Sequence, residues 1–372
     1  MSTSTHSRRV REKLEFTLKA MVLGLTAVAA LPAAADPVWM VTPVPANPGS
    51  LTDVVVPAAK DAWAVGFRLT ETDFETLALR WDGLAWKRRA VPQLGRANAV
   101  AARSANEVWV VGDEATARWD GLRWKRIEYQ AVPNASAGMY DVTAVGATDV
   151  WAVGTFQPQD TYAPQAQAQR WDGSAWKRVP VPVAGESSAL LGIDAFGGQV
   201  WAVGYTFTEA GGDQGIALRW SSGRWISVPV PTIPNTHVEL YDVKVLSSNA
   251  VWAVGWSSAL GSAERKPLAM YWDGARWKIT PTPGVNAQLN AVTLSSVDGV
   301  IAVGYRLNET GVAPYALKWT GSGWVPAATP SAPGAGLFSV DAAPDGRLWT
   351  VGFFQEPGAS DSSPLAAVSS IK

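Results

Sequence analysis

Short stretches in which bulky apolar residues alternate with small ones recur along the chain from Trp39 onward. In Trp63-Ala64-Val65-Gly66-Phe67, the bulky side chains fall on one face and alanine and glycine on the other, as in a β-strand. The Val-Gly step recurs every 42 to 51 residues, without long segments of helical periodicity between the copies. Such intervals, with strand patterning, are typical of β-propeller blades. The seven glycines of this step are Gly66, Gly112, Gly154, Gly204, Gly255, Gly304 and Gly352.

Each repeat unit predicts four short strands, which we call A to D. In the third unit they span about 139–145, 149–155, 166–172 and 175–181, and the C–D hairpin turns within Trp171-Asp172-Gly173-Ser174-Ala175-Trp176. Asp-Gly favours a tight turn, and tryptophans that flank it can pair across the two strands. Nineteen of the twenty tryptophans fall at such repeated positions, and Trp256 is the exception.

The alternation in strand B also predicts how blades pack on one another. Bulky side chains of one blade need a floor of small residues on the next if the interior is to be densely filled. We expect the alanines and glycines of strand B to form this floor. Replacing Gly204 or Gly255 with valine is therefore expected to overpack an interface between blades.

The two ends of the repeat region complement each other. The last unit has three strands before Lys372, and Trp39-Met40-Val41-Thr42-Pro43 matches a fourth strand such as Trp176-Lys177-Arg178-Val179-Pro180. An N-terminal strand that completes the last blade would remove exposed sheet edges. The sequence thus predicts an all-β fold, a single seven-bladed β-propeller of four-stranded blades closed by the N-terminal strand, over residues 36–372.

Residues 1–35 are predicted to be a signal peptide. Basic residues between Arg8 and Lys19 precede an apolar run from Ala20 to Leu31, and Ala33-Ala34-Ala35 offers a cleavage site. The apolar run is shorter than the about 20 residues that span a bilayer. We expect a secreted protein, extracellular or associated with the cell wall, with no transmembrane segment after cleavage. The general and the twin-arginine export routes both stay open.

Composition narrows the possible chemistry. The net charge is -1 with no basic block in the repeats, which argues against a nucleic-acid partner. The chain has no cysteine and only His6 and His237, which argues against cysteine nucleophiles, Ser-His-Asp triads and multi-histidine zinc sites. We expect a monomer without a cofactor, and leave calcium open.

Acidic residues recur just before the first buried valine of strand A, the innermost strand. They are Asp53, Asp141 and Asp242. Three carboxylates around one channel suit a cation such as calcium, or sugar hydroxyls. Alternatively, each carboxylate bonds backbone amides and fixes its own blade, and recurrence at one repeat position favours this interpretation.

Aromatic residues follow the Val-Gly step in five units, Trp256 and Tyr205 among them. With Tyr140 and Tyr241, they predict either a stacking platform for sugar rings at the channel mouth or packing between blades. Repetition favours packing, whereas the unusual position of Trp256 favours a ligand. The candidate ligand-binding residues are therefore Trp256, Tyr140, Tyr241, Asp53, Asp141 and Asp242, and no catalytic residue or metal ligand is assigned.

Over about residues 37–372 the repeats resemble secreted bacterial β-propellers of the kelch and galactose-oxidase-like group. The resemblance implies the fold but no single activity, because propellers carry many functions. The Asp-Gly-x-x-Trp turn lacks the Ser-x-Asp-x-Gly spacing of the sialidase Asp box, so no catalytic residue is transferred.

We expect a non-catalytic binding module or interaction scaffold at the cell exterior, with a glycan, a cell-wall polymer or an extracellular protein as partner. One alternative is a polysaccharide-active enzyme of glycosidase or lyase type, with channel-mouth carboxylates as general acid and base, either Asp141 with Asp242 or a glutamate of a loop. A structural surface protein that needs no small ligand is a third hypothesis.

Overall fold

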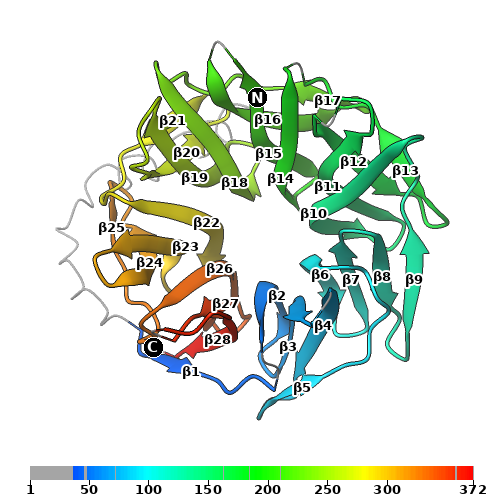
Figure 1. Cartoon of the computed structure of the whole chain (residues 1–372), viewed down its shortest axis with the longest axis vertical. Coiled ribbons are helices and arrows are strands. Elements are labelled where there is room, and N and C mark those ends of the chain that lie inside the picture. The colour runs from blue at the N-terminus through cyan, green and yellow to red at the C-terminus, as the bar shows by residue number, and fades with distance from the viewer. Residues whose placement is uncertain are drawn as a thin grey trace, which may run out of the picture. The chain divides into compact units, whose positions relative to one another are not determined.

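Each repeat unit folds into an antiparallel sheet of four strands, and seven sheets surround a central channel (Figure 1). The computed structural model describes residues 37–371 except residues 46, 47, 72, 162, 184, 210 and 357. The predicted signal peptide lies outside the described residues. No helix in the described part of the chain is long and apolar enough to cross a membrane. The predicted seven-bladed propeller of four-stranded blades is confirmed.

Strands A to D follow one another in the sheet order of each blade, with strand A at the channel. Blade 1 consists of β2 (Gly49–Ala58), β3 (Asp61–Leu69), β4 (Phe74–Trp81) and β5 (Trp86–Arg88). Blade 2 consists of β6 (Ala97–Ser104), β7 (Glu107–Gly112), β8 (Ala115–Trp119) and β9 (Trp124–Glu128). Blade 3 consists of β10 (Ala135–Gly146), β11 (Asp149–Pro158), β12 (Gln165–Trp171) and β13 (Trp176–Val179). Blade 4 consists of β14 (Ser187–Phe196), β15 (Gln199–Thr208), β16 (Gly212–Ser221) and β17 (Arg224–Ser227). Blade 5 consists of β18 (Thr236–Ser247), β19 (Ala250–Ala259), β20 (Lys266–Trp272) and β21 (Trp277–Thr280). Blade 6 consists of β22 (Ala287–Ser295), β23 (Gly299–Asn308), β24 (Gly311–Trp319) and β25 (Trp324–Pro326).

Blade 7 joins the two ends of the repeat region, as predicted. Its strands are β26 (Ala335–Ala342), β27 (Leu348–Phe354), β28 (Ser363–Ser369) and β1 (Trp39–Val41), and β1 pairs antiparallel with β28. The indole Nε1 of Trp39 also donates a hydrogen bond to the carbonyl of Ala328, 2.8 Å away on the chain that leaves blade 6. The N-terminal strand therefore completes blade 7 and also contacts its neighbour.

Tryptophans join neighbouring blades as well as the two strands of a hairpin. Trp63 in strand B of blade 1 contacts both hairpin tryptophans of blade 2, Trp119 and Trp124, with ring centroids 5.8 and 5.3 Å apart. Such contacts contribute about 0.5–1.5 kcal/mol each beyond burial. The same cluster forms at five further boundaries, around Trp109, Trp151, Trp201, Trp252 and Trp349.

The boundary between blades 6 and 7 differs from the other six. Ile301 replaces the strand-B tryptophan of blade 6, and Ser369 lies opposite Trp39 where the other hairpins pair two tryptophans. Of the three tryptophans that form this cluster elsewhere, only the strand-D residue, Trp39, is kept at the boundary that the N-terminal strand closes.

The strand-B glycines have a different role from the expected one. A Cβ on Gly255 would lie 1.9 Å from the carbonyl oxygen of Glu239, in strand A of the same blade. A Cβ on any of the other six glycines of this step would lie 2.0–2.5 Å from a backbone carbonyl oxygen in strand A of its own blade, or directly before that strand. The expectation that these glycines form the floor for a neighbouring blade is wrong. The alanines do form it: Ala64 of blade 1 packs with Trp349 and Val351 of blade 7.

A β-bulge in strand A accounts for this close approach. In blade 5, Leu240 pairs with Gly255 and Asp242 with Val254, which leaves Tyr241 without a partner opposite it. All seven innermost strands have this irregularity at the same place. A bulge bends the strand and redirects its side chains.

We predict that Gly255→Ala destabilises the protein by about 1–3 kcal/mol or more, because the added Cβ forces the bulge away from strand B. Chemical denaturation measures this loss as a lower unfolding midpoint. Gly323→Ala is the matched control, since a Cβ there meets no atom within 4 Å. Equal stability of the two variants would show that the close approach is not needed.

Candidate ligand site at the channel mouth

The channel is lined by side chains two residues apart on the innermost strands. Asp242 and Lys244 of β18 illustrate the pattern, because residues i and i+2 of a strand share a face. These side chains surround a cavity of about 280 Å³. Its charged lining consists of Asp53, Asp141, Asp194, Asp242, Asp341 and Lys244.

The predicted carboxylates bond their own blade and also the next one. Oδ1 of Asp242 accepts the N–H of Val243 at 2.7 Å, and Oδ2 accepts the N–H of Val292 in blade 6 at 2.8 Å. Asp53 and Asp141 make the same pair of bonds, reaching Val100 of blade 2 and Ile193 of blade 4 at 2.7 and 2.6 Å.

Two further aspartates make the same kind of link one level deeper in the channel. Asp194 of blade 4 accepts the N–H of Val245 in blade 5, and Asp341 of blade 7 accepts the N–H of Val56 in blade 1, both at 2.8 Å. Neither aspartate was predicted from the sequence. The signal was available, because each follows the predicted upper position by two residues.

Asparagines cross the two remaining boundaries. Asn98 donates from Nδ2 to the carbonyl of Met139 at 2.8 Å, and Asn290 donates to the carbonyl of Leu337 at 2.7 Å. Both are the unpaired residues of their bulges. Every blade boundary is therefore crossed by a polar side chain of the innermost strand.

Burial in the channel raises the pKa of four of its carboxyl groups, those of Asp53, Asp141, Asp242 and Asp341. The pKa of Asp53 rises to about 6 despite hydrogen bonds from Ser339 and two backbone amides, and that of Asp242 rises to about 7. Burial, followed by the charges of Asp242 and Asp53, raises the pKa of Asp141 well above its ordinary value. The pKa of Lys244 is raised chiefly by the charge of Asp194, so this amine stays protonated.

The mouth of the channel is formed by the unpaired bulge residue of each blade and the residue after each strand-B glycine. These pairs touch in several blades: the Tyr140 hydroxyl lies 3.1 Å from Oγ1 of Thr155, and the rings of Phe338 and Phe353 lie 5.2 Å apart. The seven bulge residues are Thr52, Asn98, Tyr140, Leu191, Tyr241, Asn290 and Phe338.

Trp256 is packed within this mouth and is only 6% exposed. Its Nε1 donates to the hydroxyl of Tyr241 at 2.9 Å, and the guanidinium of Arg265 lies over its ring, 4.3 Å from the centroid. Arg265 also donates to the amide oxygen of Gln288 in blade 6. Two of the predicted site residues are therefore joined directly, beneath an arginine from the following loop.

Glu239 and Tyr205 extend this group across blades 4 and 5. Burial and the charge of Asp213 raise the pKa of Glu239, against hydrogen bonds from Tyr241 and Trp256. The pKa of Tyr205 is raised by burial and then by the charge of Glu239, with a smaller effect of Tyr140. We name Tyr140, Tyr205, Tyr241 and Trp256 the mouth arc. Tyr140 is 37% exposed and offers a ring to the solvent.

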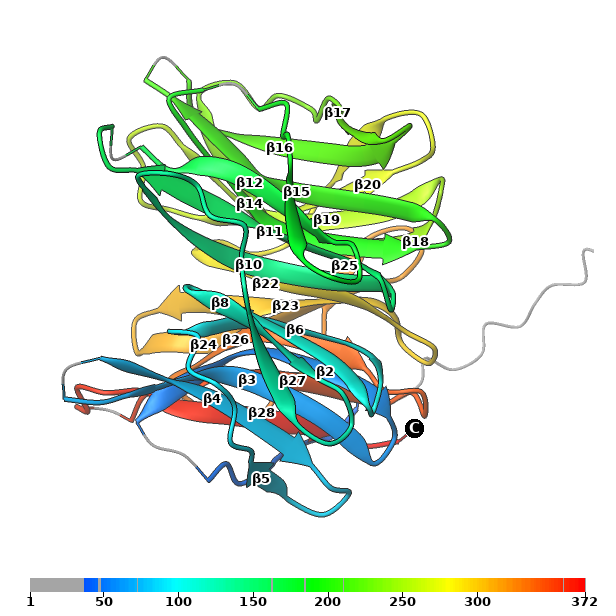
Figure 2. The same ribbon diagram turned by 90° about the vertical axis from the view of Figure 1, so that its right-hand side faces the viewer.

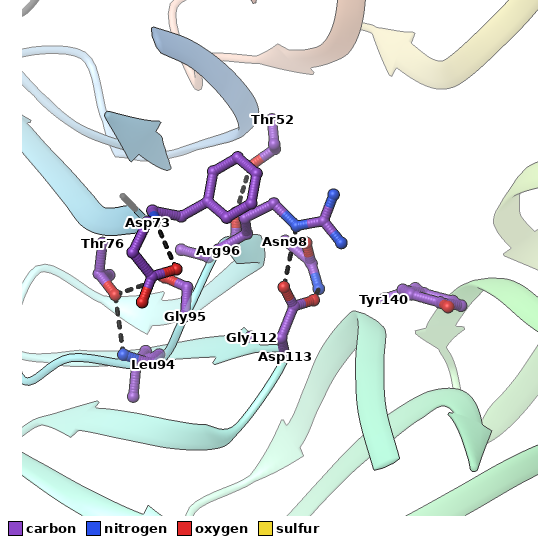
Figure 3. Close-up of polar contacts among 12 residues, drawn as sticks. Thr52, Asp73, Thr76, Leu94, Gly95, Arg96, Asn98, Gly112, Asp113 and Tyr140 are labelled. Atoms are coloured by element: carbon purple, nitrogen blue, oxygen red, sulfur yellow. Dashed lines mark hydrogen bonds and ion pairs between the residues drawn. The ribbon is translucent and has the colours of Figure 1, made fainter. Parts of the chain in front are cut away.

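A polar group lines the mouth at blades 1 and 2. Arg96 donates to Asp113 at 2.9 Å, and Asn98 donates to the same carboxylate at 3.0 Å. Figure 3 shows this group together with Thr52, and Tyr140 on the next blade. The mouth thus has a charged group at blade 2 and aromatic side chains at blades 3 to 5, with a further aromatic pair at blade 7.

No group of three or more His, Cys, Asp or Glu side chains in the described ranges is placed to hold an ion. His237 lies 2.9 Å from Asp213 of the neighbouring blade and so links blades 4 and 5.

A scan against protein-family models and a search of curated proteins find no match. Among solved structures, the chain is similar to Ycf48 bound to D1 peptide, at 14% identity and a TM-score of 0.56, covering 91% of this chain and 98% of that one. It is also similar to the WD40 β-propeller domain of Doa1, at 12% identity and a TM-score of 0.57, with 90% and 97% covered. The extracellular domain of the one-component system BT4673 from B. thetaiotaomicron matches at 10% identity and a TM-score of 0.52, with 89% and 40% covered. These likenesses show the fold alone.

We predict that the protein is less stable at pH 8 than at pH 5. The raised pKa values of Asp53 and Asp242 mean that the native state binds more protons than the unfolded chain above the ordinary value of 3.8. The free energy of unfolding therefore falls as pH rises toward 7, by about 1.4 kcal/mol for each pKa unit of one group. The hairpin aspartates titrate below this range; the pKa of Asp172 is lowered to about 2 by Ser174 and backbone amides.

Thermal unfolding across this pH range measures the effect. Asp242→Asn removes one titrating group and should flatten the slope. A midpoint that stays constant or rises between pH 5 and pH 8 would contradict the role of the channel carboxyls.

Proposed function

We propose that the protein is a non-catalytic binding module whose ligand occupies the channel mouth over blades 3 to 5. One observation carries the proposal. The aromatic rings, hydroxyls, carboxylate and guanidinium of the mouth arc and its neighbours gather at one sector, while the channel carboxylates already bond backbone amides. Aromatic side chains with a few convergent polar groups are typical of ligand-binding sites.

The chemistry of this sector favours a glycan or cell-wall polymer as ligand. The ring of Tyr140 can pack on the apolar face of a sugar, as aromatic side chains do on other apolar surfaces. Glu239 can accept hydrogen bonds from sugar hydroxyls, and Arg265 can donate them. In this proposal the protein acts outside the cytoplasmic membrane, as its predicted signal peptide suggests. Membership of the kelch and galactose-oxidase-like group stays a prediction.

A polysaccharide-active enzyme is the second candidate, favoured by the raised pKa values of Asp141 and Asp242. General acids are often carboxyl groups with such raised values. However, both oxygens of each carboxylate accept backbone N–H bonds. These hydrogen bonds favour a structural role for the pair.

We predict that the protein binds a defined carbohydrate on an array of glycans and cell-wall fragments, and that Tyr140→Ala weakens this binding about fivefold, since a well-placed aromatic contact contributes on the order of 1 kcal/mol. Phe196→Ala is the matched control, because Phe196 is an aromatic residue 61% exposed at the opposite end of a blade. Titration of the array ligand against both variants, with calcium and with chelator, measures the loss. Equal affinity of wild type and Tyr140→Ala would remove the mouth arc from the site.

The enzyme hypothesis makes a separate prediction. Incubation with polysaccharides should yield no shortened product from the wild type if the binding proposal holds. Turnover that disappears in Asp141→Asn and in Asp242→Asn, while both variants stay folded, would instead establish the catalytic role.

A further inference from the structure

The face opposite the mouth is formed by the A–B turns and the C–D hairpins, and we call it the hairpin face. The antiparallel strands place these turns at one end of each blade, and the B–C loops and blade connections at the other end (Figure 2). The mouth arc therefore lies on the far side of the propeller from the hairpin face.

On the hairpin face, some basic side chains are not paired with acidic side chains of the same face. Most of its carboxylates are paired within their own blades, as Asp61 is with Arg80 at 2.7 Å and Asp149 with Arg170 at 2.7 Å. Within the described residues, five exposed cations here form no salt bridge within 4 Å, one on each of blades 1 to 5. They are Lys60, Lys125, Lys177, Arg224 and Arg276.

Two leucines protrude from this face at neighbouring hairpin tips. Leu84 of blade 1 is 88% exposed, and Leu122 of blade 2 is 87% exposed. Each backbone N–H is held by the turn aspartate, Leu84 by Asp82 at 3.0 Å and Leu122 by Asp120 at 2.9 Å. The turns thus hold the backbone of both leucines in place.

A basic residue lies beside each leucine. Lys60 lies beside the first tip, because a Cβ on Gly83 would be 3.4 Å from the Cβ of Lys60. Arg123 directly follows Leu122, with 87% of its side chain exposed, and its contact with Asp120 is 3.9 Å long. A protruding aliphatic side chain with a basic residue beside it is complementary to a surface with negative headgroups above an apolar layer.

We propose that the hairpin face of blades 1 and 2 docks on an anionic membrane surface, with Leu84 and Leu122 entering the interfacial layer and Lys60, Arg123 and Lys125 facing the lipid phosphates. Single aliphatic tips separated by charged residues fit a lipid interface better than a protein partner, which usually covers a continuous apolar core. Docking in this way leaves the mouth facing away from the membrane. The proposal is independent of what the mouth binds.

Co-sedimentation with phosphatidylcholine vesicles, with and without phosphatidylglycerol, tests the proposal. The protein is used from residue 36 onward, so that the apolar run at 20–31 does not contribute, and β1 still closes blade 7. We expect binding to the anionic vesicles alone, weakened by added salt. Lys125→Glu should lower the affinity at least about fivefold, and Leu84→Ala with Leu122→Ala about tenfold.

Matched variants on the mouth face serve as controls. Leu307→Ala, at a residue that is 54% exposed there, and Arg306→Glu, at its exposed neighbour, should leave vesicle binding unchanged. Equal binding to neutral and anionic vesicles would overturn the proposal. Binding to anionic vesicles that both leucine substitutions leave intact would also overturn it, in favour of a purely polyanionic partner.

Discussion

The bulge in each innermost strand, opposite a strand-B glycine, is the constraint on which the rest of the structure depends. It sets two consecutive side chains toward the channel, where a regular strand would place them on opposite faces. In blade 5 these are Tyr241, which lies at the mouth, and Asp242, which bonds the backbone of blade 6. Because the glycine has no Cβ, strand B can approach the bulged backbone closely enough to pair with it. The same local feature thus joins the blades and shapes the mouth.

The links between blades explain why perturbed carboxyl groups need not indicate catalysis here. A buried backbone N–H without an acceptor costs about 1–3 kcal/mol, so an aspartate that serves two such groups stabilises the boundary even though its own burial is unfavourable. The raised pKa values of Asp53 and Asp242 reflect that burial. Perturbed pKa values occur in structural networks as well as in active sites. In this propeller, Asp53 and Asp242 bond the backbone of neighbouring blades.

Much of the fold could be predicted from the sequence because its cues are local. The Val-Gly spacing, the Asp-Gly hairpins and the spare strand at Trp39 sufficed for blade number and closure. The bulge could not be predicted, because a single extra residue in strand A is not apparent from the alternation of side chains along the strand. The glycines were consequently assigned to the wrong neighbour. The position of the signal peptide and of its cleavage site stays a prediction.

The candidate site was predicted less completely. The exceptional register of Trp256 drew attention to β19, but the cover of its ring by Arg265 depends on a loop contact that no repeat pattern encodes. Asp194 and Asp341 lie two residues after Gly192 and Ser339, so the alternation of a strand places them on the same face, toward the channel. Neither was predicted, because only one position per blade was compared. Lys244 follows Asp242 by the same rule.

Hydrogen–deuterium exchange with soluble cell-wall fragments tests most directly whether the mouth is the ligand site. The account predicts slower exchange at the starts of β10 and β18 and in the loop at 260–265, with little change in the C–D hairpins. Protection confined to the hairpins, or to the outer strands with none at the mouth, would contradict it.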